Sequence, residues 1–127
     1  MGNIAKAAEL FDEMITSAGE YGRAEAVVNG LLYKASALSW LDRDQCLKTS
    51  DEAFKLSRNL SRELLRVHTE GYCAYWHLLF IGWRSEDEMA LSRAVESSQR
   101  LGHLTFLSLT KGRQSFFQLL RSDYREA

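Results

Sequence analysis

The sequence predicts an all-α protein built from antiparallel helix pairs that repeat about every 41 residues. The first observation is a fixed step along the chain, since Gly71 lies 41 positions after Gly30 and Gly112 lies 41 positions after Gly71. The same step relates three arginines and three leucines, namely Arg43, Arg84, Arg125, Leu38, Leu79 and Leu120. Second, apolar residues recur at helical spacing along the whole chain. Third, the 127 residues include no proline, as expected for long helices joined by short turns.

Six helices are expected, and local signals mark several of their ends. The expected helices span residues 3–19, 21–41, 45–60, 62–83, 86–101 and 103–121. Gly19 and Gly102 are predicted stops, because glycine readily adopts the left-handed conformation that ends a helix. Asp44 is the expected N-cap of the third helix. Ser85 and Glu88 have the spacing of a capping box at the start of the fifth.

Helices joined by turns this short must pack side by side and antiparallel, so we expect the pairs to stack in a right-handed solenoid. The segment Gly71–Trp83 is apolar around the whole helix, which is typical of a helix enclosed by others, and we expect it at the centre. Glycine inside a helix costs roughly 1 kcal/mol relative to alanine. Gly30, Gly71 and Gly112 are therefore expected where two helices cross too closely for a β-carbon.

Composition gives no reason to expect nucleic acid or a membrane as a partner. The chain has 16 basic and 17 acidic side chains and a net charge of −1, whereas both partners favour a strongly positive surface. The longest run without formal charge, Gly71–Trp83, is shorter than the roughly 20 residues that cross a bilayer. The first residues do not have the pattern of a secretion signal. Cys46 and Cys73 are too few for a disulfide framework, so a cytoplasmic location is expected.

Four segments carry a resemblance to a known family: Gly71–Trp76, Gly82–Asp87, Arg93–Glu96 and Leu120–Ala127. They resemble the tetratricopeptide-like helical repeat region of large bacterial signalling ATPases and regulators, over about residues 20–127. The resemblance implies a tetratricopeptide-like solenoid that serves as the sensor or scaffold of a larger protein. The repeat unit is longer than the standard of about 34 residues, and the usual turn prolines are missing.

The catalytic modules of those proteins have no counterpart in the sequence. It contains no Gly-x-x-x-x-Gly-Lys-Ser/Thr phosphate loop, so the resemblance carries over no ATPase activity. Residues from Ser122 onward are expected to begin a seventh helix, and the chain is interpreted as a segment excised from a longer protein. No enzymatic activity and no cofactor are expected.

Two combinations of cysteine and histidine suggest chemistry, and each has a simpler explanation. Cys73 and His77 lie four positions apart and share a helical face, as some zinc ligands do. A complete site needs two further ligands, so we expect a core thiol beside an imidazole and no metal. Cys46 with His68 or His103 offers a nucleophile and a base, but nothing local supports that pairing.

Aromatic residues gather on the longer helices, which in a tetratricopeptide array line the inner curve. They are Tyr33, Tyr72, Tyr75, Trp76, Phe116 and Phe117. Most are expected in the core, whereas His68, Tyr72, Tyr75 and Phe116 are the expected lining of a groove, where tyrosine combines contact area with a polar tip. We therefore expect a non-catalytic protein-interaction or scaffold module of a signalling or regulatory protein, with an unidentified protein or peptide as partner.

Two alternatives stay open. One is self-association into a homodimer through apolar residues at the end of the repeat array. The residues that would form such an interface are Phe106, Phe116, Phe117, Leu119 and Leu120. The other is a domain that senses a small molecule in a cavity between helices, beside Tyr75 and Trp76.

Overall fold

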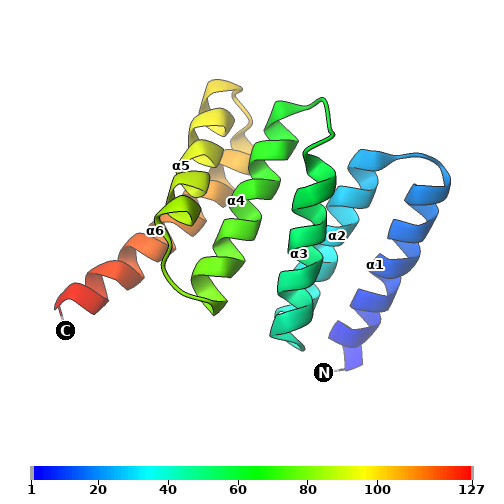
Figure 1. Cartoon of the computed structure of the whole chain (residues 1–127), viewed down its shortest axis with the longest axis horizontal. Coiled ribbons are helices and arrows are strands. Elements are labelled where there is room, and N and C mark those ends of the chain that lie inside the picture. Colours follow the sequence, from blue (N-terminus) through cyan, green and yellow to red (C-terminus); the bar gives the residue numbers. More distant parts are fainter. Residues whose placement is uncertain (1, 127) are drawn as a thin grey trace.

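The computed structural model describes the backbone of residues 2–126 and the side chains of residues 2–121. Six α-helices and no β-strand occupy these described residues (Figure 1), which confirms the all-α class. The helices are α1 Gly2–Glu20, α2 Ala24–Leu38, α3 Arg43–Ser57, α4 Glu63–Phe80, α5 Ser85–Arg100 and α6 Leu104–Glu126.

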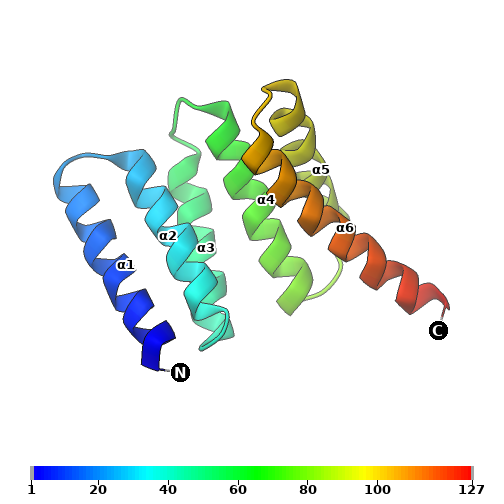
Figure 2. The same cartoon turned by 180° about the vertical axis from the view of Figure 1, so that it is seen from behind.

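The helices form a row in chain order, in which each helix packs against the one before it and the one after it. Figure 1 shows the row running from α1 to α6, with the two ends of the chain far apart. Besides its neighbours in the chain, α4 contacts both α2 and α6. In Figure 2, α2, α4 and α6 lie nearer the viewer than α3 and α5. The right-handed superhelix of a solenoid stays a prediction.

Two apolar clusters form the core, and α4 contributes to both. The first joins α2, α3 and α4 through Val28, Leu31, Leu32, Ala35, Cys46, Ala53, Leu60, Leu65, Tyr72 and Trp76. The second joins α4, α5 and α6 through Ala74, Leu78, Ala90, Leu91 and Phe117. Tyr75 packs against both clusters. The apolar circumference of α4 therefore reflects its position between two cores.

The repeated glycines differ in what surrounds them. A β-carbon on Gly30 would lie 2.6 Å from Cγ1 of Ile15, and one on Gly71 would lie 2.8 Å from Cβ of Ala94. Both positions are therefore close helix contacts, to α1 and to α5 respectively. A β-carbon on Gly112 would meet nothing within 4 Å, so the expectation of close packing at this residue is wrong. Gly112 is exposed, and no atom of another described helix lies in contact with the position that its β-carbon would take.

Two of the turns end with a glycine in the left-handed conformation. Gly22 and Gly102 have φ angles of 66° and 67°. The residue after each glycine donates its backbone N–H to a carbonyl five positions earlier, at 2.9 Å and 3.0 Å, which is the bond of a Schellman motif. The predicted stop at Gly102 agrees with this turn. The first helix, however, runs past Gly19, and the turn falls at Gly22 instead.

The starts of α3 and α5 differ from the expected ones. Asp42 rather than Asp44 is the N-cap of α3, and its carboxylate accepts a hydrogen bond from the backbone N–H of Gln45 at 3.2 Å. The N-cap of α5 is Arg84, whose side chain makes no capping hydrogen bond, and Ser85 already belongs to the helix. The expected capping box is therefore wrong.

The last helix, α6, is longer than expected. It is continuous from Leu104 to Glu126, so no seventh helix begins at Ser122. No glycine or proline occurs between Arg113 and Glu126 to interrupt it. Across residues 2–126, no helix combines the length and the apolar character that crossing a membrane requires.

Candidate binding groove

An open groove of about 410 Å³ lies between α2, α4 and α6. Its lining consists of Ser36 from α2, Tyr72, Tyr75 and Trp76 from α4, and Ser108, Leu109, Gly112, Arg113 and Phe116 from α6. The spacing on α4 is i, i+3, i+4, and on α6 it is i, i+1, i+4, i+5, i+8, so each helix presents one face. The absence of a side chain at Gly112 leaves room in this wall of the groove.

Tyr72 forms the buried floor of the groove and is fixed from two directions. Its hydroxyl donates to the backbone carbonyl of Leu32 at 2.9 Å and also meets the hydroxyl of Ser36. The Trp76 ring packs edge-on against Tyr72, at 5.7 Å between ring centres, and against Tyr75, at 5.0 Å. Burial raises the pKa of Tyr72, so its phenol is neutral. The floor is a pre-formed aromatic surface held by α2 and α4.

Arg113 is the only ionisable side chain in the groove lining that carries a charge at neutral pH. Its guanidinium carbon lies 4.7 Å from the centre of the Tyr72 ring and 5.7 Å from that of Tyr75. These cation–π contacts favour the charge but use none of the five N–H donors. Nη1 is buried without a hydrogen-bond partner, and no described carboxylate pairs with Arg113. Burial lowers the pKa of this guanidinium.

His68 does not line the groove, although it was expected there. Its ring is buried and stacks on Phe106, at 4.0 Å between centres and 7° between planes. Burial, together with the positive charges of Arg113 and His103, lowers the pKa of His68 to about 4. The imidazole is therefore neutral at physiological pH, and its Nδ1 is buried without a hydrogen-bond partner.

Three of the four residues expected at a groove, Tyr72, Tyr75 and Phe116, do line this one. Sequence analysis missed Leu109 and Arg113, which lie seven and three positions before Phe116 on the same helical face. Applying helical spacing to α6 from Phe116 would have found both. Ser36 could not be found in this way, because its position depends on how α2 packs against α4.

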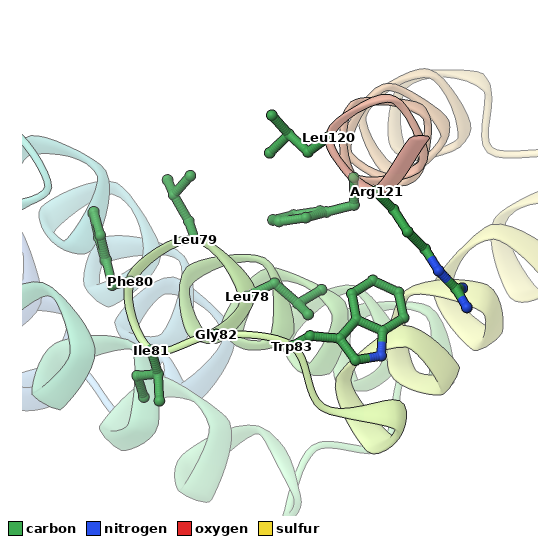
Figure 3. Close-up of a pocket in the computed structure, with 9 residues that line it drawn as sticks. Leu78, Leu79, Phe80, Ile81, Gly82, Trp83, Leu120 and Arg121 are labelled. Atoms are coloured by element: carbon green, nitrogen blue, oxygen red, sulfur yellow. The ribbon is translucent and has the colours of Figure 1, made fainter. Parts of the chain in front are cut away.

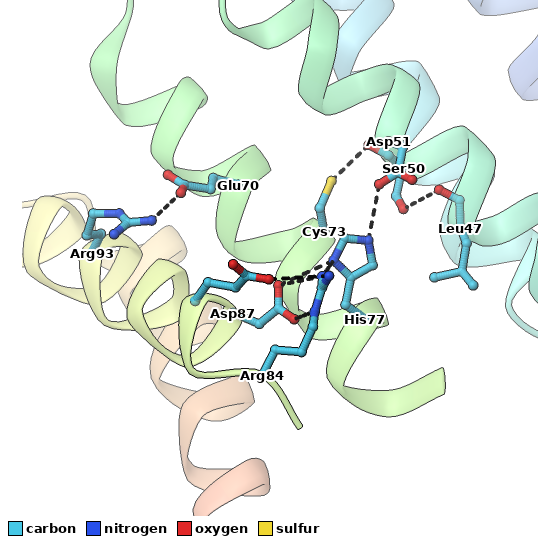
Figure 4. Close-up of polar contacts among 10 residues, drawn as sticks. Leu47, Ser50, Asp51, Glu70, Cys73, His77, Arg84, Asp87 and Arg93 are labelled. Carbon is cyan, nitrogen blue, oxygen red and sulfur yellow. Dashed lines mark hydrogen bonds and ion pairs between the residues drawn. The ribbon is translucent and has the colours of Figure 1, made fainter. Parts of the chain in front are cut away.

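A polar network occupies the opposite side of α4 and links it to α3 and α5 (Figure 4). His77 contacts Asp51 of α3 through Nε2 at 3.1 Å and Asp87 of α5 through Nδ1 at 3.3 Å. Arg84 donates through Nε to Asp87 at 2.7 Å and through a terminal nitrogen to Nδ1 of His77, also at 2.7 Å. Since Arg84 can only donate, Nδ1 of His77 accepts from it, and Nε2 carries the proton that is donated to Asp51.

The two cysteines are buried thiols rather than reactive groups. Cys73 donates to the backbone carbonyl of Ser50 at 2.8 Å, and burial raises its pKa to about 12. Burial likewise raises the pKa of Cys46 to about 12. Neither thiol is a thiolate at neutral pH, so neither is activated as a nucleophile. Among the described residues, no three histidine, cysteine or acidic side chains are arranged to hold a metal ion.

A second, larger pocket of about 610 Å³ lies between the end of α4 and the C-terminal half of α6 (Figure 3). Its lining is mostly apolar: Leu78, Leu79, Phe80, Ile81, Gly82, Trp83, Phe117, Leu120 and Arg121. The Arg121 guanidinium lies 4.7 Å from the Trp83 ring, and it also donates to Glu88 at 3.3 Å. This arginine has a carboxylate partner, whereas Arg113 has none. Phe117 is buried here, so it does not belong to an exposed apolar end as the homodimer alternative assumed.

No family model matches the chain, and no curated protein or solved structure is significantly similar to it. The resemblance to tetratricopeptide-like repeats therefore stays a prediction from the sequence.

Proposed function

We propose that the chain is a protein-interaction module that binds a segment of a partner protein in the groove between α2, α4 and α6. The observation that supports this most directly is the composition of the groove. Tyr72, Tyr75, Trp76, Phe116 and Arg113 line one continuous surface, and tyrosine, tryptophan and arginine are the residue types that contribute most binding energy at protein interfaces.

The arrangement of these residues also suits a docking surface. The floor is buried and held by hydrogen bonds and ring contacts, so little order must be gained on binding. The rim is open: Leu109 is 45% exposed and Phe116 is 41% exposed. Small-molecule sites usually enclose most of their ligand, whereas an open groove with an apolar rim fits a chain segment.

The proposal is tested by selecting binding peptides from a random library displayed on phage and measuring their affinity by isothermal titration calorimetry. Leu109→Ala and Phe116→Ala remove the two rim side chains. Met89→Ala is the matched control, because Met89 is also exposed, at 60%, but lies on α5 outside the groove. We expect each rim variant to weaken binding by about fivefold to thirtyfold and the control to leave it unchanged.

Circular dichroism establishes that the variants are folded, which is expected because the truncated side chains are partly exposed. Selected peptides that bind the double rim variant as tightly as the wild type would show that the groove is not the docking surface.

A further inference from the structure

Arg113 differs from the other partly buried or network-forming arginines of this chain. Arg84 and Arg121 have carboxylate partners in Asp87 and Glu88, and Arg66 donates to a backbone carbonyl. Arg113, which is partly buried in the groove wall, makes no ion pair and no hydrogen bond within the described residues. An arginine in such a position leaves a strong buried donor, Nη1, without an acceptor, which destabilises the folded chain.

We infer that Arg113 is the recognition point for a carboxylate on the partner segment, an inference that depends on the groove being the docking surface proposed above. A guanidinium matches a carboxylate in shape, because two parallel N–H groups can donate to its two oxygens. The Tyr72 and Tyr75 rings stabilise the cation without using those donors. A carboxylate of the partner therefore supplies the hydrogen-bond acceptor that Arg113 lacks in the folded chain.

The charge distribution around the groove supports the same occupant. Its nine lining residues include one cation and no acidic side chain. The apolar rim at Leu109 and Phe116 selects for an apolar or aromatic group next to the carboxylate. A nucleic acid is a poor fit, since binding a phosphate backbone uses many cations and this groove has one.

The first experiment titrates the chain with benzoate, a small aromatic carboxylate, and with benzamide, its uncharged counterpart of the same shape. The readout is the chemical shift of the Arg113 Nε–H group in 15N NMR spectra. We expect saturable shifts with benzoate and binding at least tenfold weaker with benzamide. The benzoate shifts should diminish as salt is added. Phenyl phosphate is the third probe, and binding of it alone would overturn the carboxylate assignment.

Substitutions then establish that the arginine itself is responsible. Arg113→Gln removes the charge, and Arg113→Lys keeps the charge but loses the paired donors. Arg121→Gln is the matched control, because Arg121 lies on the same helix outside the groove. Benzoate affinity, measured for the variants by shifts of neighbouring backbone amides, should fall at least tenfold in Arg113→Gln, fall less in Arg113→Lys and be unchanged in Arg121→Gln. Equal binding of benzoate to Arg113→Gln and to the wild type would overturn the inference.

The peptides selected on the groove separate this inference from the proposed function. If the docking groove and the carboxylate inference are both correct, removing the carboxylate of a selected peptide weakens its binding to the wild type but not to Arg113→Gln. Amidation of the peptide C-terminus then distinguishes a terminal carboxylate from an Asp or Glu side chain. Peptides that depend on Phe116 but not on Arg113 would leave the docking groove standing and refute the carboxylate. Peptides that depend on neither residue would refute both.

Discussion

Arg113 and Tyr72 form a pair in which the guanidinium carbon lies 4.7 Å from the centre of the phenol ring. The same ring donates its hydroxyl proton to the carbonyl of Leu32, so Tyr72 connects α6 to α2 across α4. The pair places a cation on a buried aromatic floor with no anion beside it. Stability and binding are therefore expected to respond in opposite directions when Arg113 is replaced.

Arg113→Met is expected to stabilise the free chain by about 1 kcal/mol. Methionine keeps the apolar length of the side chain but removes the unpaired donors, and replacing buried charged groups by apolar ones of similar volume is often neutral or stabilising. The lost cation–π contacts reduce the gain, since each is worth roughly 0.5–1 kcal/mol. Urea denaturation followed by circular dichroism measures the change. A loss of more than 1 kcal/mol would mean that the contacts with Tyr72 and Tyr75 outweigh the desolvation of Arg113.

Tyr72→Phe is expected to destabilise the chain by about 1 kcal/mol, because it removes the hydroxyl that bonds Leu32 and meets Ser36. The phenyl ring retains the contacts with Trp76 and Arg113, so folding should stay cooperative. Tyr33→Phe is a matched control, since Tyr33 is 58% exposed and its hydroxyl makes no hydrogen bond within the described residues. Similar losses in the two variants would show that the hydroxyl of Tyr72 has no special role in joining α2 to α4.

The repeated glycines allow a paired substitution with opposite expected signs. Gly71→Ala should destabilise the chain by roughly 1–2 kcal/mol, because its new β-carbon would lie 2.8 Å from Cβ of Ala94 and one helix must move. Gly112→Ala should stabilise it by about 0.5–1 kcal/mol, since the site is open and alanine is the better helix former. Thermal unfolding of both variants measures the two changes.

Ala94→Gly serves as the control for the close contact. In the double variant, Ala94→Gly makes room for the methyl group that Gly71→Ala adds. The double variant should therefore lose less stability than the sum of the losses in the two single variants. Additive effects would show that α4 and α5 do not press on each other at this point.

The contrast between Gly71 and Gly112 also shows what the sequence could predict. Six helices in order follow from apolar spacing and from glycine positions, and the structure has them. The 41-residue step, however, predicts where glycines recur but not which helix each glycine packs against. Gly30 packs on the preceding helix, Gly71 on the following one, and Gly112 on none that is described.

The same limit applies to the groove and to the polar network. Tyr72, Tyr75 and Phe116 share helical faces that spacing reveals. The unpaired state of Arg113 and the position of Ser36 depend on how α6 and α2 cross α4. His77 lies 26 positions from Asp51 and 10 from Asp87, so their contact exists only because α3 and α5 flank α4.

Within the polar network, Asp87→Asn is expected to cost about 2–3 kcal/mol, and Asp51→Asn less than about 1 kcal/mol. Asp87 has a side chain only 8% exposed and accepts two hydrogen bonds from Arg84, so its neutralisation weakens charge-assisted bonds to a carboxylate that is shielded from solvent. The Asp51 side chain is 49% exposed, where ion pairs are screened by solvent. Chemical denaturation at 0.05 M and 0.5 M NaCl measures the loss of stability in each of the two variants. Equal losses in the two variants would contradict the importance of burial.

His68 is expected to make the chain sensitive to acid. Burial lowers its folded pKa to about 4 from the ordinary 6.5, with Arg113 and His103 adding to the effect, so the folded state keeps the ring neutral. Between these two values the unfolded chain binds a proton that the folded chain does not. The contribution of the neutral His68 ring to the free energy of unfolding is therefore fully present above pH 6.5 and is lost as the pH falls from 6.5 to 4. A difference of this size corresponds to about 3 kcal/mol.

His68→Phe isolates this contribution from the carboxylates that titrate in the same range. Phenylalanine retains an aromatic ring beside Phe106 and cannot be protonated. The wild type should lose about 3 kcal/mol more than His68→Phe between pH 7 and pH 4, measured by urea denaturation at half-unit intervals. His68→Gln, which is also uncharged but smaller, should show the same weakened pH dependence even if it is less stable overall. Parallel stability curves for the wild type and both variants would show that His68 gains its proton equally in the folded and unfolded chain, and that its place against Phe106 does not exclude the charged ring.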